Sequence, residues 1–215
     1  MPVGITILAA IIAIVAHEVS HGWAALLLGD NTAKRCGRLS LNPIKHIDPL
    51  GSIILPFVLT MGGLPAFGWA KPVPIDFVKL KNYSRDIVLV SSAGIITNII
   101  LAFTTALIIY KFGPMMPALL SVFFINFMII NVVLALFNLL PFPPLDGSKI
   151  FFGWIKKDWA QKYIHSAKYG IWSLAGLLLL LPFLSRILGF GSDPLQSYLR
   201  HGIQIFNYTI SQIIS

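Results

Sequence analysis

The stretch IIAIVAHEVSHGWAALLL, residues 11–28, decides how this chain folds and where its chemistry lies. It is an aliphatic run long enough to lie in lipid, yet His17, Glu18 and His21 interrupt it. A charged side chain at the centre of a bilayer costs about 2.5 kcal/mol or more on insertion scales. Glu18 is also the only glutamate among the 215 residues. Because ionisable groups within membrane helices are rare and usually functional, this helix is expected to carry the active groups.

The composition is that of an integral membrane protein. Hydrophobic residues make up 56% of the chain and charged residues only 11%, whereas soluble domains carry roughly 25% charged residues. The net charge of +8 does not indicate nucleic-acid binding, because basic residues in a membrane protein mark cytoplasmic loops and contacts with anionic lipid. The first residues, MPVGITILAA, lack a basic region, so no cleavable signal peptide is expected.

The hydropathy pattern predicts an all-α polytopic membrane protein that forms a single domain over residues 1–215. A span needs about 20 mainly apolar residues. Four segments qualify as spans: 3–28, 87–110, 117–140 and 170–188. Segment 49–70 lacks charges, but prolines and glycines interrupt it, so it is either a broken span or a re-entrant loop. Segment 194–215 has the spacing of an amphipathic helix in the membrane interface, or of an ordinary docking helix.

The distribution of lysine and arginine favours the re-entrant interpretation of segment 49–70. If this segment re-enters, loops 29–48, 71–86 and 141–169 share one face and hold 13 of the 16 basic residues. If it spans, the better orientation divides the same residues nine against seven. Basic loops stay in the cytoplasm. The first helix is therefore expected to run from the outside to the inside.

His17-Glu18-Val19-Ser20-His21 is an HExxH motif. Residues four apart share one helix face, so both imidazoles can reach one Zn²⁺ while Glu18 sits beside the attacking water as its base. The motif fixes only three positions. Two polar contacts in a helix bundle, with an accidental glutamate between them, are the alternative interpretation.

A catalytic zinc takes three protein ligands and leaves one position for water. A second glutamate cannot complete this site, because none exists. Asp146 stands out, because it follows the predicted span 117–140 closely and three prolines keep the residues before it out of a helix. An Asp-Gly turn is the alternative role for Asp146. The other candidates are His46, His165, His201, Cys36 and the remaining six aspartates.

Together these motifs resemble the site-2 protease family of intramembrane zinc metalloproteases. The likeness lies in HEVSH (17–21), NLLPFPPLDG (138–147), LNPIKHIDPLGSIILPFVL and FGWAKPVPI, and covers some two thirds of the chain. The last two stretches are similar to the compact prokaryotic branch. The family's AGPxxN motif stands here as AGIITN (93–98), with isoleucine in place of proline, which affects the expected kink of the helix rather than the chemistry.

The resemblance implies that His17, His21 and Asp146 bind one Zn²⁺ per chain and that Glu18 is the catalytic base. The expected activity is hydrolysis of peptide bonds within or near transmembrane segments of membrane proteins. Asn98 and Asn138 are candidates for orienting substrate or stabilising an oxyanion. Hydrogen bonding between helices is the alternative for both, and the resemblance favours function for Asn138.

The expected partners are transmembrane protein substrates and the lipid bilayer, in a prokaryotic cell membrane, with the active site opening to the cytoplasm. Two other functions use the same residues differently. A metal transporter would line a permeation path with them, although the paired repeats typical of transporters are not visible. A non-proteolytic protein would capture hydrophobic segments without cutting them. The physiological substrate, any prior cleavage, the gating signal and the oligomeric state are not determined by the sequence.

Overall fold

The computed structural model describes residues 3–61, 68–155, 162–163 and 193–214, and the single residues Gly170, Leu174, Ser185 and Ile187. Every regular element within these residues is helical, which confirms the predicted all-α class. The α-helices are α1 (Val3–Leu27), α2 (Thr32–Arg35), α3 (Leu55–Met61), α4 (Tyr83–Phe112), α5 (Ala118–Asn138), α6 (Asp146–Phe152) and α10 (Pro194–Ile214). The shorter turns are η1 (Pro43–His46), η2 (Pro49–Ile54), η3 (Phe77–Lys79) and η4 (Gly113–Met115).

Three helices in the described part are long and apolar enough to cross a membrane: α1, α4 with its continuation to Met115, and α5. They coincide with the predicted spans 3–28, 87–110 and 117–140. Helix α4 is longer than predicted at both ends, because it continues past Asp86 and Lys111, the charges that bounded the apolar run. The fourth predicted span, 170–188, lies outside the described residues apart from four single positions.

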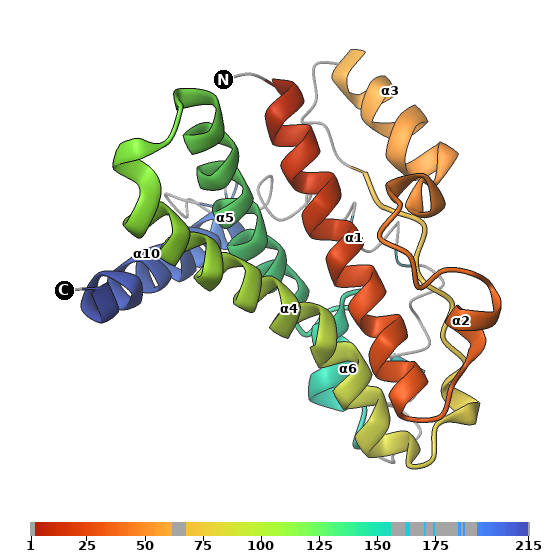
Figure 1. Ribbon diagram of the computed structural model, residues 1–215. Coiled ribbons are helices and arrows are strands. Elements are labelled where there is room, and N and C mark those ends of the chain that lie inside the picture. Colours follow the sequence, from red (N-terminus) through yellow and green to blue (C-terminus); the bar gives the residue numbers. More distant parts are fainter. Residues whose placement is uncertain are drawn as a thin grey trace.

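Helices α1, α4 and α5 form an antiparallel bundle in which small residues allow close approach (Figure 1). Ala9 and Ala13 of α1 are fully buried and pack with Phe127 of α5. Ala102 of α4 is also fully buried. Because lipid is as apolar as a leucine side chain, membrane helices associate through close packing of this kind rather than through the hydrophobic effect.

The antiparallel arrangement brings three helix ends together. Ala25 near the end of α1 packs with Val90 near the start of α4, and with Leu80 before it. Helix α5 returns antiparallel to α4 after a short turn, so its C-terminal end lies at the same end of the bundle (Figure 1). The loop that follows α1, the approach to α4 and the start of α6 therefore meet beside the end of α5.

Segment 49–70 returns to the place from which it leaves. The backbone N–H of Lys71 donates to His46 O at 2.9 Å, and that of Trp69 donates to Gly51 O at 3.2 Å. Between these closures lie the short helices η2 and α3. Their 13 residues are about 20 Å long at 1.5 Å per residue, against a hydrocarbon core about 30 Å thick. These closures agree with the predicted re-entrant segment, and its path relative to the bilayer stays a prediction.

Helix α10 docks on α5 with its first turns. The Tyr198 hydroxyl donates to Leu136 O at 3.1 Å, and a Cβ added to Gly202 would clash with a methyl group of Leu136. Figure 1 shows the rest of the helix projecting away from the bundle. Ile205 and Tyr208 are exposed on this projecting part, and the placement of the predicted amphipathic helix 194–215 in the membrane interface stays a prediction.

We predict that reporter fusions after residues 45, 80 and 155 all report the cytoplasm, and that a fusion near residue 113 reports the outside. The physical reason is the retention of lysine- and arginine-rich loops on the cytoplasmic side. Paired alkaline phosphatase and fluorescent protein fusions in a bacterial inner membrane measure this. Opposite locations for the fusions after residues 45 and 80 would mean that segment 49–70 crosses the bilayer.

Candidate metal centre

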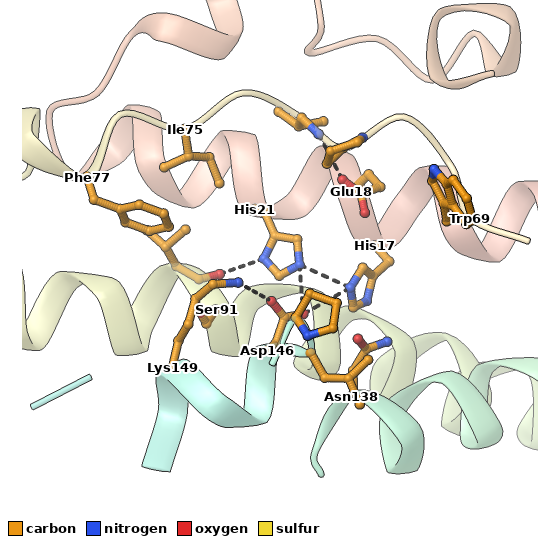
Figure 2. Close-up of a pocket in the computed structure, with 15 residues that line it drawn as sticks. His17, Glu18, His21, Trp69, Ile75, Phe77, Ser91, Asn138, Asp146 and Lys149 are labelled. Atoms are coloured by element: carbon orange, nitrogen blue, oxygen red, sulfur yellow. Dashed lines mark hydrogen bonds and ion pairs between the residues drawn. The ribbon is translucent and has the colours of Figure 1, made fainter. Parts of the chain in front are cut away.

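Helix α1 places His17 and His21 one turn apart on the side that faces α4 and α5 (Figure 2). Both side chains are buried, with only 6% of each residue exposed. Their Nε2 atoms lie 3.0 Å apart. The i, i+4 spacing of HExxH therefore brings the two nitrogens to one point, as the motif requires for a shared ion.

Asp146 reaches the same point from a different part of the chain. It is the first residue of α6 and is buried where that short helix begins beside the end of α5. Its Oδ2 atom lies 3.2 Å from His17 Nε2 and 3.1 Å from His21 Nε2. Among the described residues these three form the group of His, Cys, Asp or Glu side chains that is able to hold a metal ion.

The outer nitrogens of both imidazoles are occupied by carbonyl acceptors on α4. His17 Nδ1 lies 2.6 Å from Asn98 Oδ1, and His21 Nδ1 lies 2.7 Å from the backbone oxygen of Val90. Since a carbonyl oxygen only accepts, each Nδ1 carries a hydrogen, and in the neutral imidazole each Nε2 then presents a lone pair. Two such lone pairs and a carboxylate oxygen repel one another at these distances, so the arrangement calls for a cation among them.

The spacing of the three atoms fits zinc. Ligand bonds of about 2.0–2.1 Å at tetrahedral angles put neighbouring ligand atoms roughly 3.3 Å apart. The observed separations of 3.0, 3.2 and 3.1 Å are close to this value. Two imidazoles and one carboxylate are also a donor set used by catalytic zinc, with one position left for water.

Two further hydrogen bonds in series hold the Asn98 side chain in place. Its Nδ2 donates to Asn131 Oδ1 at 2.8 Å, and Asn131 Nδ2 donates in turn to the backbone oxygen of Phe127 at 2.8 Å. Both asparagines are fully buried. This chain of donors leaves Asn98 Oδ1 facing His17, and so determines which nitrogen of His17 points to the metal position.

The structure changes the interpretation of the two asparagines that the sequence singled out. Asn98 lies behind His17 and is not part of the cavity wall, so its position does not suit contact with substrate or an oxyanion. Asn138 does line the cavity, and its Nδ2 donates to Leu134 O of its own helix at 3.0 Å. Asn131 was not predicted from the sequence, because a lone asparagine in an apolar helix has no local signature.

A glycine on α4 makes the close approach of α1 possible. A Cβ added at Gly94 would lie 2.5 Å from both His17 Cε1 and His21 Nε2. In the sequence Gly94 appeared only as part of the AGIITN motif (93–98). The imidazoles in fact pack against the bare backbone of α4 at this position, so any side chain there would displace the ligands.

Glu18 stands beside the cluster in a cavity of about 360 Å³. Its Oε2 accepts a hydrogen bond of 2.9 Å from the backbone N–H of Val73. The cavity is also lined by His17, His21 and Asp146, by Trp69 and Asn138, and by Lys149, whose Nζ lies 3.4 Å from Asp146 Oδ1. Figure 2 shows Glu18 and Asn138 on opposite sides of the two imidazoles.

The other candidate ligands lie elsewhere or outside the described residues. His46 is buried and contacts Ser40 O through Nε2. His201 is exposed on α10 and contacts Ser197 O. Cys36 is exposed. His165 falls outside the described residues.

The chain matches peptidase family M50 over residues 5–183. It is 40% identical over 167 residues to "Putative zinc metalloprotease YwhC" of Bacillus subtilis, and the matched region covers 74% of this chain and 73% of that protein. It is 28% identical over 173 residues to "Putative zinc metalloprotease Rip2" of Mycolicibacterium smegmatis, and the matched region covers 79% of this chain and 64% of that protein. No solved structure matches the chain significantly.

We predict that the purified protein holds one tightly bound zinc and that Asp146→Ala removes it. The physical reason is the loss of one of only three ligand atoms. Elemental analysis after dialysis against a weak chelator measures the content. Asp193→Ala is the matched control, because Asp193 caps the start of α10, and it should keep its zinc. Full zinc occupancy in Asp146→Ala would contradict the ligand assignment.

We predict that Asn98→Leu lowers zinc affinity about 10–100-fold, the usual cost of losing the hydrogen-bond partner of a ligating histidine. Competition with a chelator of known affinity measures it. Asn126→Leu is the control, because Asn126 donates only to Val122 O of its own helix. Equal affinities in the two variants would show that Asn98 does not orient His17.

Proposed function

The chain belongs to peptidase family M50, and on this premise we propose that it is an endopeptidase that cuts peptide bonds within or near transmembrane segments of other proteins. Family membership confirms the resemblance to site-2 proteases found in the sequence. The family and the names of both relatives make the chain a zinc metalloprotease with membrane-spanning helices. The site of cleavage and the roles of individual residues belong to the proposal.

The observation that carries the proposal is the buried cluster of His17, His21 and Asp146 beside the only glutamate of the chain. Three converging ligand atoms leave room for a water, and Glu18 lines the same cavity. A permeation path for metal ions would require release of the ion in two directions. The described part of the site instead holds the ligands rigidly through Val90 and Asn98.

In the proposed reaction, His17, His21 and Asp146 would hold a zinc ion, which would supply an acidified water and polarise the peptide carbonyl. Glu18 accepts the proton of the attacking water and then delivers it to the leaving amine. Asn138 lies across the imidazoles from Glu18, where a side-chain amide is well placed to stabilise negative charge on the carbonyl oxygen (Figure 2).

The substrate must present an extended peptide to the cavity. A helical transmembrane segment uses its carbonyl groups in its own hydrogen bonds, so it has to unwind before any of them can be attacked. The cavity wall includes the extended residues around Val73, together with Trp69 and Phe77. Such a wall suits a peptide with apolar side chains, which is the composition of transmembrane segments.

The proposed setting is a prokaryotic cell membrane with the cavity open to the cytoplasm. The support is the position of Asp146 and of loops 29–48 and 71–82 at one end of the bundle, because these loops are basic. Water and product would exchange at that end. The partners proposed are single-span membrane proteins, and cleavage profiling of such proteins in cells with wild type against Glu18→Gln would identify them.

We predict that Glu18→Gln folds, inserts and retains zinc but loses proteolysis by about 10²–10⁴-fold, the usual worth of general acid–base steps. Glutamine keeps the shape of Glu18 and an oxygen that accepts the Val73 hydrogen bond, but it is not basic enough to take a proton from water. Cleavage of a single-span membrane protein in detergent, with zinc content on the same sample, measures both effects. A zinc-loaded variant that cleaves at the wild-type rate would end the proposed mechanism.

A further inference from the structure

An extended stretch of chain runs along α1 over the catalytic cavity. We name residues 69–76 the strap; they have no regular secondary structure and lead from the re-entrant segment to η3. The hydrogen bonds that fasten it include Lys71 N–H to His46 O at 2.9 Å, Arg38 Nη2 to Lys71 O at 2.7 Å, and Asp76 N–H to Asp30 Oδ2 at 2.7 Å. The strap is therefore a fixed wall of the site.

Asp30 holds the far end of the strap as a carboxylate. Burial acts to raise the pKa of Asp30, but hydrogen bonds from the side chain and backbone of Thr32 and from the backbone of Asp76 outweigh it and lower the pKa. Asp30 is fully buried. A buried carboxylate that accepts several hydrogen bonds is a firm anchor.

The strap lies unusually close to α1 at one point. A Cβ added to Gly22 would lie 2.5 Å from Leu39 Cδ2 and 2.9 Å from Val73 Cγ1. Gly22 is four residues after Glu18, on the same helix face. The absence of a side chain at Gly22 therefore lets Val73, which is itself buried, lie against the helix one turn from the proposed base.

The hydrogen bond between Val73 N–H and Glu18 Oε2 is preorganised by two prolines. Pro72 and Pro74 have no N–H, so Val73 supplies the only backbone donor of the three residues. Pro74 also restricts Val73 to extended backbone. The restricted backbone therefore holds the Val73 N–H toward Glu18, and the N–H donates to Glu18 Oε2 at 2.9 Å.

We propose that the backbone N–H of Val73 positions Glu18 for proton transfer by holding one carboxylate oxygen and leaving the other for the attacking water. This inference rests on the proposed function. A glutamate has three rotatable side-chain bonds, and a misplacement of about 1 Å can cost roughly 10²-fold in rate. Figure 2 shows Glu18 between the strap and the imidazoles, which is the place such a positioned base has to occupy.

The first test replaces the donor. Val73→Pro removes the N–H in a stretch that is already extended and flanked by prolines, so the backbone path is preserved. Val73→Ala is the control, because it keeps the N–H and trims only the side chain. With a purified single-span membrane protein as substrate in detergent, Val73→Pro should lower kcat at least about 10-fold with KM within about 3-fold of wild type. Its zinc content should be unchanged.

The same experiment distinguishes the competing role of Val73. If its N–H bound the substrate backbone instead of Glu18, Val73→Pro would raise KM and leave kcat near the wild-type value, and the proposal would be overturned. A kcat for Val73→Pro equal to that of Val73→Ala would also overturn it. No cleavage by the zinc-loaded wild type would instead refute the proposed function itself, and the inference with it.

A second measurement needs no activity. Amide hydrogen exchange of a peptide covering the strap should show Val73 protected in wild type and exchanging at least about 10-fold faster in Glu18→Ala, because its acceptor is lost. Gly22→Ala should speed this exchange and lower kcat, because its Cβ pushes Val73 away from α1. Gly4→Ala is the matched control on the same helix, since nothing lies within 4 Å of the added atom. Faster exchange in Gly22→Ala with an unchanged kcat would overturn the proposal.

Discussion

The structure depends on the convergence of three electron-rich atoms inside a helix bundle. The three atoms are His17 Nε2, His21 Nε2 and Asp146 Oδ2, and each lies 3.0–3.2 Å from the other two. In lipid such a cluster is costly unless a cation neutralises it and every remaining polar atom is paired. The surrounding hydrogen bonds follow from this requirement.

Helix α4 meets the requirement with one face. Val90, Gly94 and Asn98 are spaced four apart, so they form a row opposite His17 and His21. The first accepts from His21, the second leaves room for both rings, and the third accepts from His17. Helix α5 contributes Asn131, which accepts from Asn98 Nδ2 and so leaves Asn98 Oδ1 facing His17. The register of the two helices is therefore fixed by polar contacts as well as by packing of small residues.

The adjacent face of α1 is organised around Glu18. His17 and His21 face α4 and α5, whereas Glu18 meets the strap, which reaches it over the side-chain-free surface of Gly22. Segment 49–70 explains how the strap gets there, because its closing hydrogen bonds bring the chain back beside α1 at His46 and Gly51.

The sequence by itself determined the all-α membrane class, the three long helices, the family, and the residue types of a zinc site. These follow from composition, from helical periodicity and from short motifs, all of which are local. Asp146 could also be predicted, because a proline-rich turn after a span is a local signal. The tertiary structure alone decided that Asn98 lies behind His17 rather than in the cavity, and that Asn131, Gly94 and Val73 complete the site. Their roles depend on which helix faces meet and in what register, and a backbone N–H or a missing side chain has no signature until a partner packs against it.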